Sequence, residues 1–123
     1  MDLVISALPH LWLIDLDGTI VKHNGHLIGD ESLLPGVKDF WKQLPSEDRI
    51  VLLTARSSEF RDKTVEFLRL HDLRYDTILF DLPKGERILI NDQKASGLTT
   101  AIAYCPVRDQ GLDSVRVTIS EEL

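Results

Sequence analysis

Apolar runs alternate along this chain with segments in which apolar positions recur at helical spacing. The runs predict strands at residues 11–16, 49–53, 77–80, 86–90 and 100–105, with a last edge strand at 115–119. Helical spacing predicts one helix over residues 35–44 and a second that begins at Ser57 or Ser58 and ends near His71. Strands that are apolar throughout are typical of a parallel sheet covered on both faces. With right-handed crossovers, the pattern predicts an α/β fold, a three-layer Rossmann-like sandwich around a parallel central sheet.

Two connections depart from this alternation. Residues 20–34 are polar and carry Asn24-Gly25 between apolar flanks, a strong two-residue hairpin signal that predicts a small β-hairpin flap after the first strand. Between residues 81 and 99, no convincing crossover helix joins the third and fourth predicted strands. No repeat or linker divides the chain, so residues 1–123 are expected to form a single domain with one core.

The candidate chemistry begins where the first predicted strand ends, in the segment HLWLIDLDGTI. Asp15 and Asp17 would share one face of a continuing strand, and two carboxylates this close repel each other unless a positive charge lies between them. A hard cation that takes oxygen ligands, such as Mg²⁺, meets that need. The alternative is a pair of turn acids, because Asp-Gly alone is a common turn signal.

Polar residues also follow two later predicted strands. Thr54, Ala55 and Arg56 come directly after the strand at 49–53, and Asn91 and Asp92 follow the strand at 86–90. The carboxyl ends of parallel strands lie along one edge of a sheet, so these residues are expected to meet the acid pair there. Carboxylates and a hydroxyl gathered on one edge are what metal-assisted phosphoryl transfer requires.

The string DLDGT resembles motif I of the haloacid-dehalogenase-like (HAD) hydrolases, most of which are phosphatases that use an aspartyl-phosphate intermediate. The resemblance implies that Asp15 is the nucleophile and that Asp17 is the general acid and base. Thr54 in LLTAR resembles motif II, whose hydroxyl binds the phosphoryl group. Substrate contacts are then expected from the residues that adjoin these two motifs, namely Gly18, Thr19, Ala55 and Arg56.

Two further motifs are matched towards the C-terminus. Lys84 in LPKGERILIND stands where the motif III lysine is expected, and Lys94 is a rival for that role. Asp92 with Asn91 resembles motif IV, the second source of ligands for Mg²⁺. Asn91 stands where an acid is common, which lowers the negative charge around the metal. The implied metal set is Asp15, the backbone carbonyl of Asp17, Asn91 and Asp92.

Several other side chains have two interpretations. Arg56 could reach substrate or be a solvated arginine at a helix start. His23 and His26 flank the Asn24-Gly25 pair, where they are expected to be exposed turn residues, with substrate contact as the alternative. Trp12 and Trp41 are expected to lie in the core.

Composition narrows the class of protein. The formal net charge of −6 argues against a general nucleic-acid or membrane-surface binder. No apolar run approaches the ~20 residues of a membrane span, and the N-terminus lacks the basic region of a signal peptide, so a cytoplasmic location is expected. The single cysteine, Cys105, excludes an internal disulfide and is expected to be a small buried residue at a strand end.

The gaps after the first two motifs hold no cap domain, so the chain resembles the capless HAD branch. A flap, a second copy of the chain or a bulky substrate would then have to cover the open site. The expected function is that of a Mg²⁺-dependent phosphomonoester hydrolase acting on a sugar phosphate or another small metabolite. The alternatives are a phosphatase for phosphoprotein or nucleic-acid ends, a catalytically weak HAD-like binding or regulatory module, and a receiver-like signalling domain.

Overall fold

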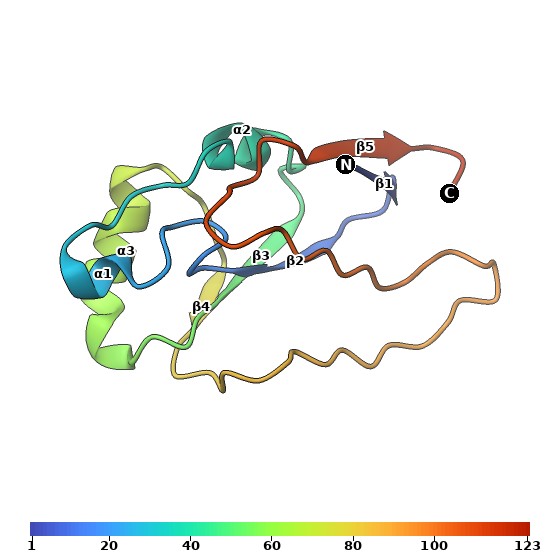
Figure 1. Cartoon of the computed structure of the whole chain (residues 1–123). Coiled ribbons are helices and arrows are strands. Elements are labelled where there is room, and N and C mark those ends of the chain that lie inside the picture. The colour runs from blue at the N-terminus through green and yellow to red at the C-terminus, as the bar shows by residue number, and fades with distance from the viewer.

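The chain forms an α/β fold, as a computed structural model of all 123 residues shows (Figure 1). Its regular elements are short and are joined by long connections. In chain order they are β1 (Asp2–Ser6), β2 (Leu11–Asp15), α1 (Gly25–Ile28), α2 (Val37–Lys42), β3 (Arg49–Leu53), the 3₁₀ helix η1 (Ser58–Phe60), α3 (Arg61–Leu70), β4 (Thr77–Leu79) and β5 (Arg116–Ser120).

The strands form two parallel sheets. β2, β3 and β4 form a three-stranded sheet in that order, with Asp15 opposite Leu53 at its carboxyl end. β5 pairs in parallel with β1, so the second sheet joins the two ends of the chain. The predicted strands at 11–16, 49–53, 77–80 and 115–119 are confirmed to within one or two residues. The strand at Asp2–Ser6 was not predicted, because a short run beside the N-terminus carries no alternation long enough to mark it.

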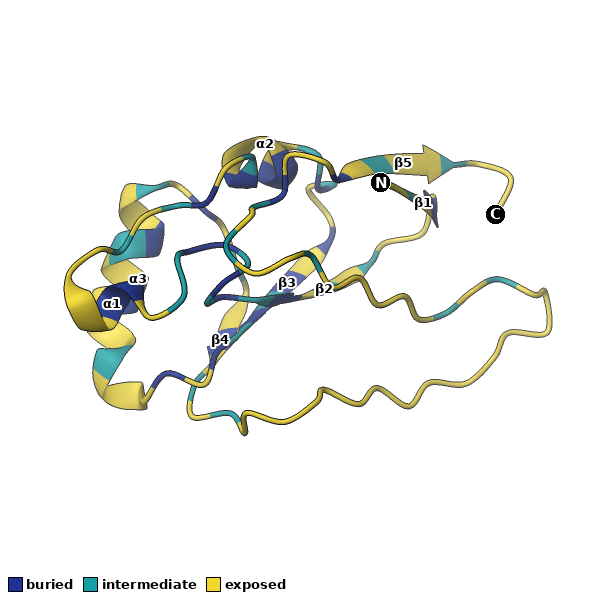
Figure 2. Ribbon diagram, viewed as in Figure 1, coloured by how far each residue is buried: buried dark blue, intermediate teal, exposed yellow.

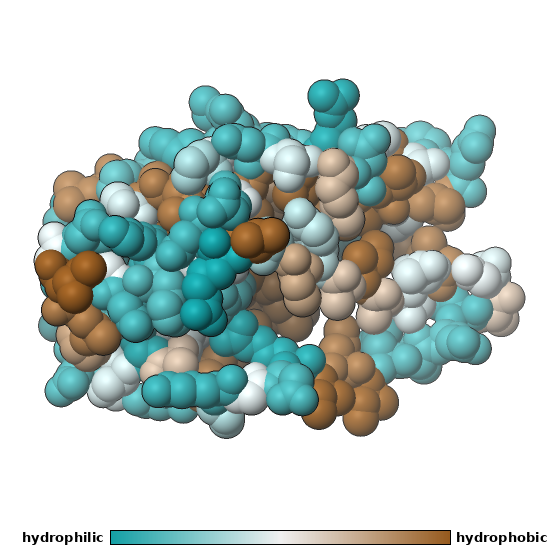
Figure 3. Space-filling model, viewed as in Figure 1, coloured by the Kyte–Doolittle hydropathy of each residue, from teal (hydrophilic) through white to brown (hydrophobic).

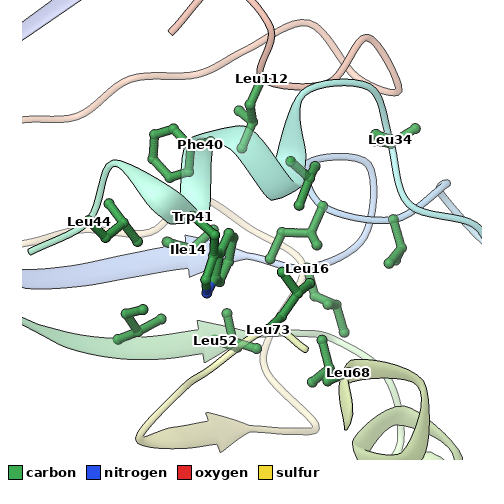
Figure 4. Packing of buried hydrophobic residues seen from close by; sticks show 14 of the residues in the cluster. Ile14, Leu16, Leu34, Phe40, Trp41, Leu44, Leu52, Leu68, Leu73 and Leu112 are labelled. Carbon is green, nitrogen blue, oxygen red and sulfur yellow. The ribbon is translucent and has the colours of Figure 1, made fainter. Parts of the chain in front are cut away.

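The core lies on one face of the β2–β3–β4 sheet (Figure 4). Alternate strand residues point into it, Ile14 from β2, Ile50 and Leu52 from β3 and Ile78 from β4. Helices α2 and α3 cover this face, and both occupy the ranges that helical spacing predicts. The side chain of Ser57 caps the second helical segment by accepting from the backbone N–H of Glu59, 3.3 Å away, as the sequence predicts.

The opposite face of the same sheet is open to solvent, so the prediction of a sheet covered on both faces is wrong. Leu11 and Leu13 of β2 and Leu79 of β4 are 61%, 48% and 44% exposed (Figure 2). The parallel α/β order is present, but no third layer packs on this side. A third layer needs a helix on this side, and the chain forms no helix after β4.

The prediction of a β-hairpin flap over residues 20–34 is also wrong. This segment makes one helical turn, α1, and returns through a single antiparallel bridge between Val21 and Leu33. Asn24 adopts a left-handed conformation with φ of 57° and stands at the helix N-terminus, so the Asn24-Gly25 signal begins a helix. Gly25 is required there because a Cβ atom would overlap the backbone of Asp30.

The predicted strands at 86–90 and 100–105 are absent. Residues 83–107, here called the strap, contain no helix or strand and leave the body of the molecule as a long extended loop (Figure 1). The backbone of residues 86–90 and 100–105 pairs with no other strand. Cys105 is exposed, so the expectation of a buried cysteine at a strand end is wrong. Separately, none of the helices has the length and hydropathy needed to cross a membrane.

Candidate functional site

Two of the predicted polar segments meet at the carboxyl end of the β2–β3–β4 sheet. Asp15 ends β2 and residues 16–19 follow it, residues 54–56 follow β3, and the parallel pairing of these strands places both segments side by side. This edge is here called the rim. It is the place where an open parallel sheet usually presents its ligand-binding residues.

Asp17 is the centre of a polar network on the rim. Thr54 donates its hydroxyl to Asp17 Oδ2 at 2.7 Å, and Arg56 Nε donates to Asp17 Oδ1 at 2.9 Å. The Thr54 hydroxyl also accepts the backbone N–H of Arg56 at 3.0 Å. Both oxygens of Asp17 therefore already accept hydrogen bonds, one of them charge-assisted, and the carboxylate is held in a fixed orientation.

Arg56 is buried, which neither interpretation of its sequence position anticipated. Its side chain is 1% exposed, and besides Asp17 it contacts Glu31 Oε1 through Nη1 at 2.7 Å and donates to Thr64 Oγ1 at 2.9 Å. Its remaining nitrogen, Nη2, has no hydrogen-bond partner. Arg56 thus links the rim to the segment after α1 and to α3, and it keeps one donor free for a further oxygen.

His26, from α1, lies beside this network without a hydrogen bond to it. It is buried, with Nδ1 3.8 Å from Asp17 Oδ1 and its ring packed edge-on against Phe60 at 4.9 Å between centroids. Burial lowers the pKa of His26, and the nearby Arg56 guanidinium lowers it further, outweighing the opposite effect of Asp17 and Glu31. His26 was expected to be an exposed turn residue, and that prediction is wrong.

Asp15 has different surroundings from its neighbour. Its side chain is 35% exposed, Thr19 donates to its Oδ2 at 3.0 Å, and Arg87 of the strap donates to its Oδ1 at 2.8 Å. The two acids therefore do not share one cation but have one arginine each. Asp15 is the carboxylate that a solute can reach, and Arg87 is the cation it would meet there.

The turn after Asp17 is held from the C-terminal side of the chain. Gly18 has φ of 86°, and its carbonyl oxygen accepts the backbone N–H of Asp109 at 2.8 Å. A Cβ atom at Gly18 would lie 3.1 Å from Cγ of Arg108, which packs over the turn. The Asp109 carboxylate also accepts the backbone N–H of His23 at 2.8 Å. A long-range clamp therefore fixes the glycine of the DLDGT string.

Other predicted site residues are not brought to the rim. Ala55 is on the rim and is exposed. Four other predicted residues lie exposed on the strap and make no side-chain bond to either acid, namely Lys84, Asn91, Asp92 and Lys94. The predicted residues that do bond to the acids are Thr19, Thr54 and Arg56. Arg87, which pairs with Asp15, and Glu31 and Thr64, which contact Arg56, were not among the predicted site residues. Arg87 had a sequence signal as a basic residue within the motif-like segment LPKGERILIND, and His26 had one in its position beside the predicted acid pair.

The residues gathered here do not form the expected magnesium site. No group of three or more His, Cys, Asp or Glu side chains could hold a metal ion in this arrangement. Arg87 lies on Asp15 and Arg56 on Asp17, so two guanidinium groups neutralise the acids. Magnesium dependence accordingly stays a prediction of the sequence.

Comparison with protein-family models, with curated proteins and with solved structures finds no match for this chain. The function of the rim is therefore inferred from its own residues.

Proposed function

We propose that this chain is a phosphomonoester hydrolase in which Asp15 attacks the phosphorus atom. The observation that carries the proposal is the contrast between the two acids: Asp15 is accessible beside Arg87, whereas Asp17 is held in a buried network. A carboxylate nucleophile divides one difficult displacement into two easier ones. A guanidinium group beside it suits the oxygens of a phosphate ester, which it can bind through paired N–H groups.

The proposed reaction has two steps. An oxygen of Asp15 forms a bond to phosphorus while the bond to the leaving alkoxide oxygen breaks, and water later cleaves the aspartyl phosphate to release inorganic phosphate. Asp17 would supply a proton to the leaving oxygen and take one from the attacking water. To do so it must exchange Thr54 or Arg56 for the substrate at one of its oxygens, because both are occupied in this structure.

The substrate class we favour is a sugar phosphate or another small phosphorylated metabolite. The net charge of −6 disfavours a nucleic-acid phosphate, because phosphate-backbone binding needs a basic surface. Mg²⁺ is the proposed cofactor, with Asn91 and Asp92 as further oxygen donors, but it would require the strap to change position.

Hydrolysis of para-nitrophenyl phosphate, with Mg²⁺ and with a chelator in parallel, tests the proposal. Asp15→Asn should reduce turnover by roughly three orders of magnitude or more, because the nucleophile is lost. Asp39→Asn is the matched control, since Asp39 is an exposed acid on α2 without a bond to any rim residue and should leave turnover unchanged. Mass spectrometry of acid-quenched enzyme should find one phosphoryl group on Asp15. Turnover that survives Asp15→Asn would contradict the assignment.

A second candidate function is a catalytically weak binding module. It is favoured by the pairing of Asp17 with Thr54 and Arg56, which occupies both oxygens of the acid proposed for proton transfer, and by the exposed position of Asp92. Phosphate-ester binding without turnover over a broad substrate panel would select this alternative.

A further inference from the structure

The open face of the β2–β3–β4 sheet is apolar. Leu11, Leu13 and Leu79 are exposed on it, and Val51 and Leu53 of β3 are partly exposed between them. These side chains are contiguous, because β2, β3 and β4 are neighbours in the sheet. A contiguous apolar face on a small domain marks a surface that something else covers.

The strap carries two apolar stretches that are exposed to solvent, one in each arm. Ile88, Leu89 and Ile90 are 84%, 60% and 91% exposed, and Ile102 and Tyr104 of its second arm are 52% and 38% exposed. Residues 95–107 contain no charged side chain at all. Figure 3 shows apolar side chains gathered on the lower arm of the strap, with a hollow between that arm and the body of the molecule. Solvated loops are normally polar, so these apolar residues of the strap, like those of the open sheet face, are expected to pack against another surface.

The two arms are in contact at the turn that joins them. A turn in which the Gly97 N–H donates to the Lys94 carbonyl oxygen at 3.0 Å reverses the chain between them. Nearby, the Thr100 hydroxyl donates to the Asp92 carbonyl oxygen at 2.5 Å. The strap is thus a two-armed unit with its own turn.

Residues near both ends of the strap are bonded to the carboxyl end of the β2–β3–β4 sheet, whose open face the strap does not cover. Just before it, the backbone N–H of Leu82 donates to the Thr54 carbonyl oxygen at 3.2 Å, and within its first arm Arg87 pairs with Asp15. After it, Asp109 is bonded to Gly18 and to the backbone of His23. All these contacts lie at the carboxyl end of the sheet. A segment tethered at both ends beside a surface meets that surface at high effective concentration.

We propose that residues 83–107 close over the open face of the β2–β3–β4 sheet, with the apolar residues of both arms on Leu11, Leu13 and Leu79. The occupant of this face is the chain's own strap, because closure extends the existing Arg87–Asp15 contact and covers two apolar surfaces at once. A second copy would have to compete with a segment already tethered there. Closure does not depend on the proposed function, although it would shield Asp15 from water.

Cross-linking to the only cysteine tests closure directly. Leu13→Cys and Leu79→Cys each add a second thiol on the open face, and Glu66→Cys adds one on exposed α3 as the matched control. With a short bismaleimide at low protein concentration, the open-face variants should form the intramolecular link to Cys105 several-fold faster than the control. Equal rates would overturn the proposal. Links that form only between chains would also overturn it and would identify a second copy as the occupant.

A pair of charge substitutions gives an independent readout. Ile90 is 91% exposed in the open strap and Leu70 of α3 is 66% exposed, so an open strap predicts that Ile90→Asp is the milder change. Closure reverses the order: Ile90→Asp should lower Tm by roughly 5 °C or more, and Leu70→Asp should lower it less. A Tm that is insensitive to Ile90→Asp would contradict closure. Neither experiment uses phosphatase activity, so a failed proposal of function leaves both results interpretable.

Discussion

Arg56 is the residue on which the rim depends most. It is a buried cation between two carboxylates, Asp17 at 2.9 Å and Glu31 at 2.7 Å, with Thr64 as a third partner. A buried ion pair adds little net stability when intact, but removing one partner leaves the others without compensation. The guanidinium group therefore fixes the position of Asp17 without itself being open to solvent.

Arg56→Ala should lower the free energy of unfolding by roughly 3–5 kcal/mol, because it leaves two acids of the network without their cation. Urea denaturation at neutral pH measures the effect. Arg69→Ala is the control, because Arg69 pairs with Glu66 through a bidentate contact on the exposed side of α3. The midpoint of the control should stay at the wild-type value. A similarly small effect of Arg56→Ala would mean that the network does not hold the rim.

His26 makes the same region sensitive to acid. Its pKa is lowered in the folded chain by burial and by the charge of Arg56, so below its ordinary value of 6.5 the unfolded chain binds a proton that the folded chain does not. The contribution of neutral His26 to the free energy of unfolding is fully present above about pH 6.5. It is lost as the pH falls towards the lowered pKa of His26 in the folded chain. His26→Gln should flatten the pH dependence of Tm just below pH 6.5. An unchanged slope would contradict the role of His26.

Sequence reasoning at this scale found the residues of the rim but not their partners. Asp15, Asp17 and Thr54 were identified because each follows a short apolar run, and strand ends are local features. The network of Arg56 with Glu31, His26 and Thr64 could not be predicted, since it depends on how residues 20–34 fold back. In the sequence, that segment shows a hairpin signal, whereas in the structure it forms the helical turn α1, from which His26 packs on Phe60.

At the scale of elements, two glycines allow the start of α2 and the segment before β5 to pack closely together. Gly36 is the N-cap of α2 with φ of 77°, and a Cβ atom there would overlap the backbone of Asp113, including its Cα at 2.6 Å. Gly111, with φ of 83°, is in equally close contact with Pro35. These approaches pin the C-terminal segment against the start of α2, and they explain how β5 can return to β1 at a fixed register.

Gly36→Ala compared with Gly29→Ala separates close approach from backbone conformation. Both glycines have positive φ, 77° and 73°, but no atom lies within 4 Å of a Cβ added at Gly29. Gly29→Ala should cost about 1 kcal/mol for the left-handed backbone alone. Gly36→Ala should cost roughly 1–3 kcal/mol more, because a packed backbone must move. Chemical denaturation of both variants measures the difference, and equal losses would contradict the close approach of Asp113.

The helices and strands that were predicted correctly are those with a local signature. The Ser57 cap, the spacing of Val37, Phe40 and Trp41 and the run at Arg49–Leu53 each specify their element within a few residues. The run at residues 86–90 has the same apolar character, yet it is not a strand here. A strand exists only through its partner, and periodicity alone does not identify that partner.

At the scale of the whole molecule, a polar joint connects the two sheets. Asp48, which is buried just before β3, accepts the backbone N–H of His10 at 3.0 Å, the indole N–H of Trp12 at 2.8 Å and the His10 ring Nδ1 at 2.7 Å. The other ring nitrogen of His10 lies 3.0 Å from the carbonyl oxygen of Ser6 at the end of β1. One carboxylate therefore ties the connection between the sheets to the start of β3.

Asp48→Asn should destabilise the chain by roughly 1–3 kcal/mol at neutral pH, because an amide cannot accept every one of these hydrogen bonds. Burial alone would raise the pKa of Asp48, but the hydrogen bonds from Trp12 and His10 lower it below its ordinary value of 3.8. Its stabilising contribution is therefore fully present above about pH 3.8 and is lost as the pH falls through the lower folded pKa. The difference in unfolding free energy between wild type and Asp48→Asn, measured by denaturant titration at several pH values, should stay constant above pH 3.8 and shrink below it. A difference that remains constant into strong acid would show that the joint is not held by the ionised carboxylate.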